Sequence, residues 1–130
     1  MSKLTLWGAG LMMLVVGALH LLAPQMMMQE PSIALTSTNH LHVIRAAYGG
    51  AYLGMAALFL WGLWRPALRP ASLLAVAILF SGFALGRLIS IALDGLPVGL
   101  YLGVLSAELF FAVLAVLSLR QPRPGCDTGL

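Results

Sequence analysis

Two oppositely charged residues, Arg87 and Glu108, lie inside long apolar stretches of this chain, and Arg45 lies near the start of another. A charged side chain at the centre of a bilayer costs about 2.5–3.5 kcal/mol on insertion scales, so charges in such stretches favour a partner or a ligand. A buried carboxylate without a partner would take up a proton instead. We therefore expect Glu108 to pair with Arg87 or with Arg45.

Helical spacing groups further polar side chains with these three residues. Arg45, Tyr48 and Tyr52 are separated by three and four residues, so they share one stripe of a helix. Arg87 and Glu108 have polar neighbours at similar spacings on their own segments. The predicted polar cluster consists of Asn39, Arg45, Tyr48, Tyr52, Arg87, Ser90, Asp94, Tyr101 and Glu108. Such a cluster can bind a ligand, ion or proton, or fix helix register as a structural ion pair; contact with another subunit is a third interpretation.

Histidine and methionine side chains raise the separate question of a metal site. His20, His40, His42 and the run 26–28 of three methionines would suit copper, and two histidines on neighbouring helices can hold a b-type haem. However, His40 and His42 are two residues apart and diverge on a helix, and the single cysteine, Cys126, has no partner for a disulfide. We expect no metal or cofactor, and the three histidines remain the only candidates.

Composition identifies lipid as the solvent for these residues. Apolar residues make up 61% of the 130 residues and charged residues 8%, whereas a soluble domain carries roughly a quarter charged residues. So few charges cannot form the polar shell of a soluble protein. The net charge of +3 includes no basic block, which argues against a nucleic-acid partner. The expected partner is the lipid bilayer.

Four apolar stretches are each long enough for a transmembrane helix, which needs about 20 residues. We expect spans at about 4–22, 40–64, 71–93 and 98–119, separated by breakers such as Pro24, Pro66 and Gly95. The first stretch, which follows Lys3, also resembles a signal peptide, but its apolar run is longer than usual. The sequence thus predicts one all-α domain over 1–120, an integral membrane four-helix bundle, followed by a disordered tail at 121–130.

Charge asymmetry predicts the orientation of these spans. With four crossings, one side of the membrane carries Lys3, Arg65, Arg69, Arg120 and Arg123. Because Lys and Arg favour the cytoplasmic side, both termini are expected in the cytoplasm. Arg87 then lies roughly 9 Å below the outer end of its helix and Glu108 roughly 16 Å below the outer end of its own. The polar cluster is therefore expected toward the outer leaflet.

Small residues repeat every few positions on two of the expected helices, as Gly82, Gly86 and Ser90 on one and as Gly49, Gly50 and Gly54 on the other. Small residues at such spacing let the backbones of membrane helices approach closely. We expect these stripes to pack inside the chain, with a dimer face as the alternative.

Five short segments carry a resemblance to a known family: Asn39-x5-Arg45, the run 48–54, the run 82–90, the pair Asp94-Gly95 and the pair Glu108-Leu109. In these segments, and over most of its length, the chain resembles a bacterial four-helix membrane family known as domain of unknown function 4345. The resemblance implies an integral protein of a bacterial inner membrane. It implies no reaction, because the family has no assigned activity.

The function expected from these observations is non-enzymatic. We expect an accessory subunit of a membrane protein partner, a homo-oligomer, or a binder of a lipid-like or anionic ligand at the outer leaflet, with Arg45 and Arg87 facing the negative charge and Glu108 balancing them. One alternative is a small proton-coupled transporter that uses Glu108. Further alternatives are a haem or copper protein and an intramembrane enzyme with Glu108 as proton donor, although no second base lies at a comparable depth.

Overall fold

The part of the chain that the structure describes is mostly helical and contains no strand. The structure is a computed structural model that describes residues 1–121, so the tail expected at 121–130 lies, apart from Gln121, outside the described residues. Four helices are long and apolar enough to cross a membrane: Ser2–Leu22, Thr38–Trp64, Pro66–Asp94 and Gly99–Arg120. The prediction of an all-α protein with four membrane-spanning helices is confirmed.

Short irregular segments divide or join these long helices. The elements are α1 (Ser2–Leu22), α2 (Pro24–Gln29), α3 (Thr38–Ile44), η1 (Arg45–Gly50), α4 (Ala51–Trp64), η2 (Pro66–Leu68), α5 (Arg69–Asp94) and α6 (Gly99–Arg120). α3, η1 and α4 together form the second long helix. Ser37 caps its start, because the Ser37 hydroxyl accepts a hydrogen bond from the His40 backbone N–H at 3.2 Å. Gly95 ends α5 with a φ of 94°, a left-handed conformation that glycine adopts without strain.

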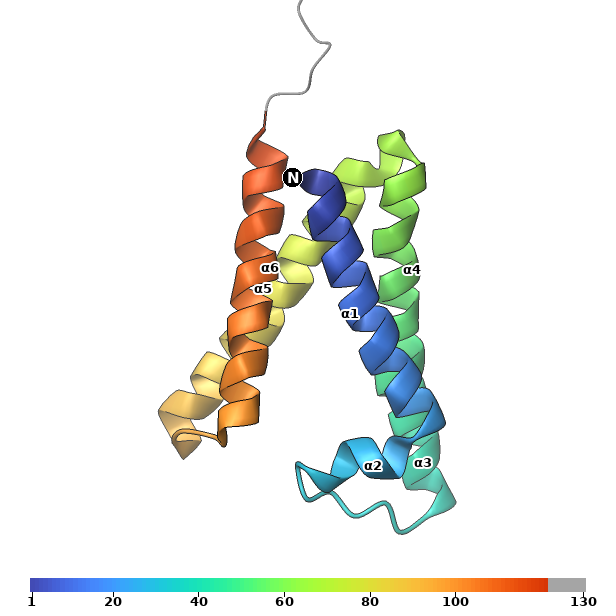
Figure 1. The fold of residues 1–130 in the computed structure, drawn as a ribbon. Helices are drawn as coiled ribbons and strands as arrows, with labels where there is room; N and C mark the ends of the chain where they lie inside the picture. Colours follow the sequence, from blue (N-terminus) through green and yellow to red (C-terminus); the bar gives the residue numbers. More distant parts are fainter. Residues whose placement is uncertain (122–130) are drawn as a thin grey trace, which may run out of the picture.

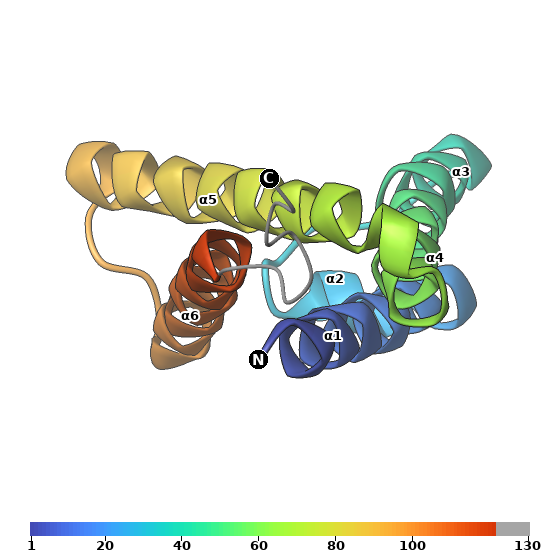
Figure 2. The same ribbon diagram turned by 90° about the horizontal axis from the view of Figure 1, so that it is seen from above.

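The long helices form two closely packed pairs, α1 with α4 and α5 with α6. Figure 1 shows the pairs meeting at the end that holds the N-terminus and diverging toward the other end, and Figure 2 shows α1 and α6 on the same side of α5. The hydrophobic core is Leu6, Ala9, Met13, Ala56, Phe59, Leu73, Val76, Ala77, Phe80, Ala112 and Ala115. No residue of α5 after Ala84 is buried. The apolar core therefore occupies the half where the pairs meet.

Glycines bring α1 and α4 into close contact. A Cβ added to Gly17 would lie 3.0 Å from the Leu53 backbone nitrogen, and one added to Gly49 would lie 3.1 Å from the Leu21 Cα. Any larger side chain at these positions would push the two backbones apart. This contact explains why α1 and α4 form one pair.

The small-residue stripe on α5 does not have this role. A Cβ added to Gly82 or Gly86 would have no atom within 4 Å, and Ser90 is exposed. The expectation that this stripe packs inside the chain is therefore wrong at Gly82 and Gly86, because no atom of another described helix lies close enough to contact an added Cβ there. Of the second stripe, Gly49 packs closely but Gly54 does not.

Two structural features that were not predicted lie at the end of the helices where α1 leads into the second long helix. The segment after α1 contains the short helix α2, in which Met28 is buried although Met26 is exposed. The second long helix contains the π-helical segment η1, Arg45–Gly50. In a π-helix, backbone hydrogen bonds join residues i and i+5, which widens the turn. Such segments are rare in proteins, but those that occur are often found at functional sites.

Candidate functional site

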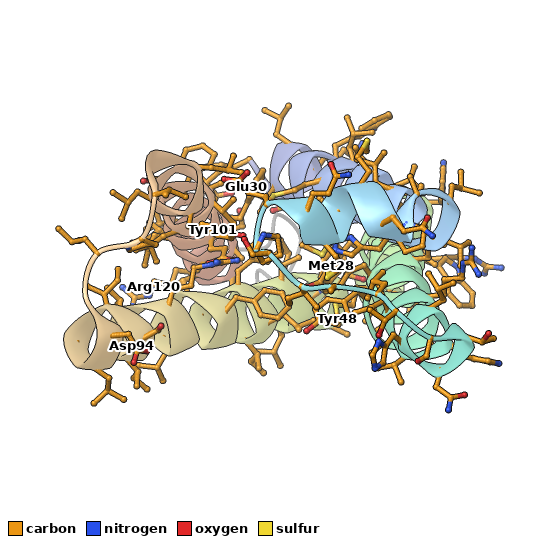
Figure 3. All side chains as sticks on the ribbon, turned by 90° about the horizontal axis from the view of Figure 1, so that it is seen from below. Met28, Glu30, Tyr48, Asp94, Tyr101 and Arg120 are labelled. Carbon is orange, nitrogen blue, oxygen red and sulfur yellow. The ribbon has the colours of Figure 1, made fainter. Side chains whose placement is uncertain are left out.

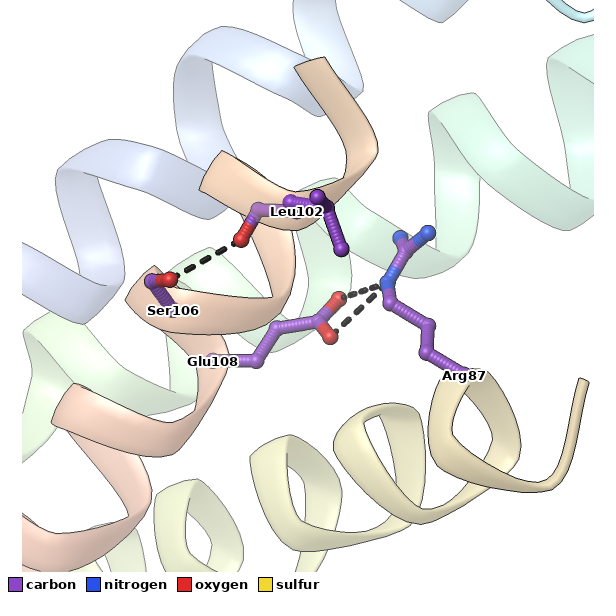
Figure 4. Close-up of polar contacts among 4 residues, drawn as sticks. All are labelled: Arg87, Leu102, Ser106 and Glu108. Atoms are coloured by element: carbon purple, nitrogen blue, oxygen red, sulfur yellow. Dashed lines mark hydrogen bonds and ion pairs between the residues drawn. The ribbon is translucent and has the colours of Figure 1, made fainter. Parts of the chain in front are cut away.

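Arg87 of α5 and Glu108 of α6 form the one ion pair among the described residues. The Arg87 Nε donates to both carboxylate oxygens of Glu108, at 3.0 and 2.8 Å (Figure 4). The Glu108 side chain is only 4% exposed, whereas that of Arg87 is 35% exposed. Of the two arginines expected as partners of Glu108, Arg87 is thus the one that forms the ion pair. The pair joins the halves of the α5–α6 hairpin.

The guanidinium of Arg87 has donors to spare. Its terminal nitrogens lie on the side away from Glu108 (Figure 4) and have no hydrogen-bond partner within residues 1–121. The Tyr101 ring lies beneath the guanidinium, with the Arg87 Cζ 5.8 Å from the ring centroid, which is a cation–π distance. Arg87 can therefore donate to a further acceptor without leaving Glu108.

A pocket of about 240 Å³ lies beside Arg87, where the turn connects α5 to α6. Its lining consists of Arg87, Ser90, Ile91, Gly95, Pro97, Tyr101 and Leu105. Two members of the predicted polar cluster, Ser90 and Tyr101, thus share a pocket with Arg87. The remaining lining is mostly apolar, which is typical of a site for a small molecule with one polar end.

On the α1–α4 side, His20 packs against two tyrosines of the predicted cluster. The His20 ring stacks on Tyr48 at 5.5 Å between centroids and meets Tyr52 edge-on at 5.8 Å. The His20 Nδ1 lies 2.8 Å from the Val16 carbonyl oxygen and donates a hydrogen bond to it. His20 is buried, at 6% exposure. The sequence suggested His20 only as a metal candidate, whereas it belongs beside Tyr48 and Tyr52.

Tyr52 connects the two helix pairs. Its ring meets the Phe83 ring of α5 at 6.1 Å between centroids. The aromatic group of His20, Tyr48 and Tyr52 on one pair thus contacts the other pair through Tyr52 and Phe83. Spacing along the chain could not predict this contact between the two pairs, because it depends on how the helices face one another.

The other predicted members lie apart from the pair. Arg45 is exposed, and its Nε donates to the Leu21 carbonyl oxygen at 3.1 Å instead of facing Glu108. Arg45 belongs to the helix pair that contains α1 and α4, and this pair diverges from the pair that carries Glu108 toward the end where Arg45 lies (Figure 1). Asp94 accepts a hydrogen bond from Ser90 at 3.1 Å. Figure 3 shows Asp94 at the far end of α5, well away from Tyr48.

The remaining polar candidates do not converge either. Asn39 is exposed at the start of the second long helix. The His40 Nδ1 accepts a hydrogen bond from the Thr36 backbone N–H at 3.2 Å, while His42 is exposed and lines a different pocket. Within residues 1–121, no three or more His, Cys, Asp or Glu side chains are grouped so that they could hold a metal ion. The three histidines therefore have three separate environments.

Comparisons with known proteins identify a family for this chain but no reaction. Neither the curated proteins nor the solved structures gave a match to the chain. A family model described as "Domain of unknown function (DUF4345)" matches residues 1–119, a range that includes nearly all of the four long helices and both residues of the Arg87–Glu108 pair. The resemblance drawn from the sequence is confirmed, and this chain with its four membrane-spanning helices belongs to that family of unknown function.

Proposed function

We propose that this protein is a non-enzymatic membrane protein that binds an anionic, lipid-like molecule beside Arg87. The observation that carries the proposal is the unused side of the Arg87 guanidinium, which lines a pocket of about 240 Å³. Guanidinium groups present N–H donors in a planar fork that matches carboxylate and phosphate oxygens. Glu108 occupies only the Nε and holds the side chain in place.

The rest of the pocket suits the same class of ligand. Ile91 and Leu105 offer apolar surface for the first carbons of a chain, while the Ser90 hydroxyl donates to Asp94 and leaves Arg87 as the donor to the ligand. The pocket holds a head group rather than a whole lipid, because sites for drug-sized ligands are about 300–1,000 Å³. A ligand with a longer apolar tail would extend into the bilayer. Such a role suits either a free-standing binder or an accessory subunit.

The proposal places this pocket at the outer leaflet of a bacterial inner membrane, with both termini in the cytoplasm. Lys3, Arg65, Arg69 and Arg120 all belong to the end of the helices opposite the pocket. Cationic residues favour the cytoplasmic side of a membrane protein, which supports this orientation.

Binding of dodecanoate tests the proposal, with dodecanol as the uncharged probe of the same length. Native mass spectrometry of the full chain in detergent is expected to show bound dodecanoate and much less dodecanol. The double variant Arg87→Gln/Glu108→Gln removes both charges together and leaves no buried charge unpaired. We expect it to bind dodecanoate about tenfold more weakly, since a hydrogen bond to a charged group contributes about 1.5–3 kcal/mol. Arg65→Gln is the control, and equal binding by the double variant and the parent would contradict the proposal.

Glu108→Gln alone distinguishes this proposal from proton-coupled transport. If an anion binds to Arg87, removing the nearby Glu108 charge strengthens binding by roughly thirtyfold, because like charges about 7 Å apart repel by about 2 kcal/mol at an effective dielectric of 20. A transporter that depends on Glu108 would instead lose proton-coupled flux in liposomes. In the structure both Glu108 oxygens accept from Arg87, so a substrate cation would have to compete with that arginine.

A further inference from the structure

A second pocket lies between the end of α1 and the start of the second long helix. It has a volume of about 350 Å³, and its lining consists of Leu21, Thr38, Leu41, His42, Arg45 and Ala46. It shares no lining residue with the pocket beside Arg87. We propose that this second pocket binds the phosphodiester group of a membrane phospholipid.

Arg45 supplies a fixed positive charge to this pocket. Its Nε donates to the Leu21 carbonyl oxygen at 3.1 Å, which anchors the guanidinium at the end of α1. Its terminal nitrogens have no hydrogen-bond partner among residues 1–121. No carboxylate of the described chain lies within 4.0 Å of Arg45, in contrast to Arg87, whose charge is balanced by Glu108. Arg45 is thus the arginine that can bind one negative charge without repulsion from a paired acid.

The other polar side chains of the pocket are hydrogen-bond donors that suit phosphate oxygens. The Thr38 hydroxyl and the His42 imidazole have no hydrogen-bond partner in the described part of the chain. Phosphate oxygens accept charge-assisted hydrogen bonds from guanidinium groups and further bonds from neutral donors. A phosphodiester carries a single negative charge, which equals the single charge of Arg45.

Position and lining favour a lipid over free phosphate. Leu21 lies one residue before the end of α1, and Thr38 is the first residue of the second long helix, so the pocket is at the membrane end of both spans. Phospholipid head groups occupy this level of a bilayer. Leu21, Leu41 and Ala46 supply apolar surface for the glycerol and the first acyl carbons.

Native mass spectrometry of the full chain in detergent, titrated with phosphatidylglycerol, tests this site. Diacylglycerol with the same acyl chains is the probe that lacks the phosphate, and it is expected to bind far less. Arg45→Gln is expected to weaken phosphatidylglycerol binding by about tenfold, as for loss of a charged hydrogen-bond donor. Thr38→Val, at an exposed position that tolerates the change, is expected to weaken it by about threefold. If Arg45→Gln fails to fold, Thr38→Val decides alone.

Two controls separate this site from the site beside Arg87. Arg65→Gln, an exposed arginine at the opposite end of the helices, and the double variant Arg87→Gln/Glu108→Gln should both retain this bound phosphatidylglycerol. Unchanged binding by Thr38→Val and by a folded Arg45→Gln would overturn the proposal. Displacement of the lipid by inorganic phosphate would also overturn it, because the pocket would then recognise free phosphate.

Discussion

Removal of Arg87 and removal of Glu108 are expected to change stability by different amounts, because the two side chains differ in exposure. Glu108 is 4% exposed, so removing Arg87 leaves a carboxylate in an apolar interior without its donor. Arg87 is 35% exposed, so removing the Glu108 charge leaves a guanidinium that can reach toward polar surroundings. We expect Arg87→Gln to lower the free energy of unfolding by about 3 kcal/mol, the value for breaking a buried ion pair. Glu108→Gln, which keeps an acceptor oxygen, should lower it by about 1 kcal/mol.

Unfolding of the purified protein in mixed micelles, followed by circular dichroism, measures these differences. Combining the two substitutions should recover most of the loss caused by Arg87→Gln, because two amides can hydrogen-bond each other without a buried charge. Equal losses for the two single variants would show that the exposures of the two side chains do not control the energy of the pair.

At the scale of single residues, the sequence predicts only those contacts that burial in lipid requires. A carboxylate deep in an apolar helix needs a cation, so the partner of Glu108 could be narrowed to two arginines before the fold was known. The choice of Arg87 over Arg45 could not be made, because it depends on α6 packing against α5 rather than against the helix that carries Arg45. The place of His20 beside Tyr48 and Tyr52 depends on how α1 faces α4, and spacing along one helix does not carry that information.

Among the elements, glycines at close contacts and glycines on open faces should respond oppositely to the same change. Gly17 of α1 faces the Leu53 backbone nitrogen, which would lie 3.0 Å from an added Cβ, whereas Gly82 of α5 has no atom within 4 Å. We expect Gly17→Ala to destabilise the protein by about 1–3 kcal/mol through overpacking. Gly82→Ala should stabilise it by up to about 1 kcal/mol, because alanine has the higher helix propensity. Thermal unfolding in detergent compares the two variants.

Gly82→Ala also tests the alternative that the small residues on α5 form a dimer interface. If the face with Gly82 and Gly86 were covered by a second copy, Gly82→Ala would weaken the association. Size-exclusion chromatography with light scattering would then show a smaller particle for Gly82→Ala than for the parent. An unchanged mass with unchanged or higher stability supports the open face seen in the structure.

Helix ends were easier to predict than helix faces. The breakers Pro66 and Gly95 act through local backbone geometry, so η2 begins at Pro66 and α5 ends before Gly95 as the sequence indicates. The buried face of each helix was harder to predict, because nearly uniformly apolar helices have no polar side to mark the exposed face. For this reason both stripes of small residues were expected inside, although only Gly49 among their glycines makes a close interhelical contact.

Across the whole molecule, the apolar core and the candidate site occupy opposite halves. The buried core lies where the helix pairs meet, and Figure 1 shows the pairs diverging toward the other end. Arg87, Glu108, His20 and the linings of the two pockets belong to this diverging half, the polar half. The close-packed half is the one that carries Lys3, and the cationic turn between α4 and α5 lies there as well. Orientation in the membrane therefore decides which aqueous compartment the polar half faces.

Labelling of introduced cysteines tests the orientation that the charges predict. In a Cys126→Ser background, Ala34→Cys places a thiol in the exposed loop after α2, and Ala67→Cys places one in the exposed turn between α4 and α5. Both are alanine-to-cysteine changes at exposed sites, so each variant is the matched control for the other. With Lys and Arg on the cytoplasmic side, a membrane-impermeant maleimide applied to intact bacterial spheroplasts should label Ala34→Cys, and should label Ala67→Cys only after the membrane is permeabilised. The reverse pattern would place both pockets in the cytoplasmic leaflet, and the ligands would then have to be sought there.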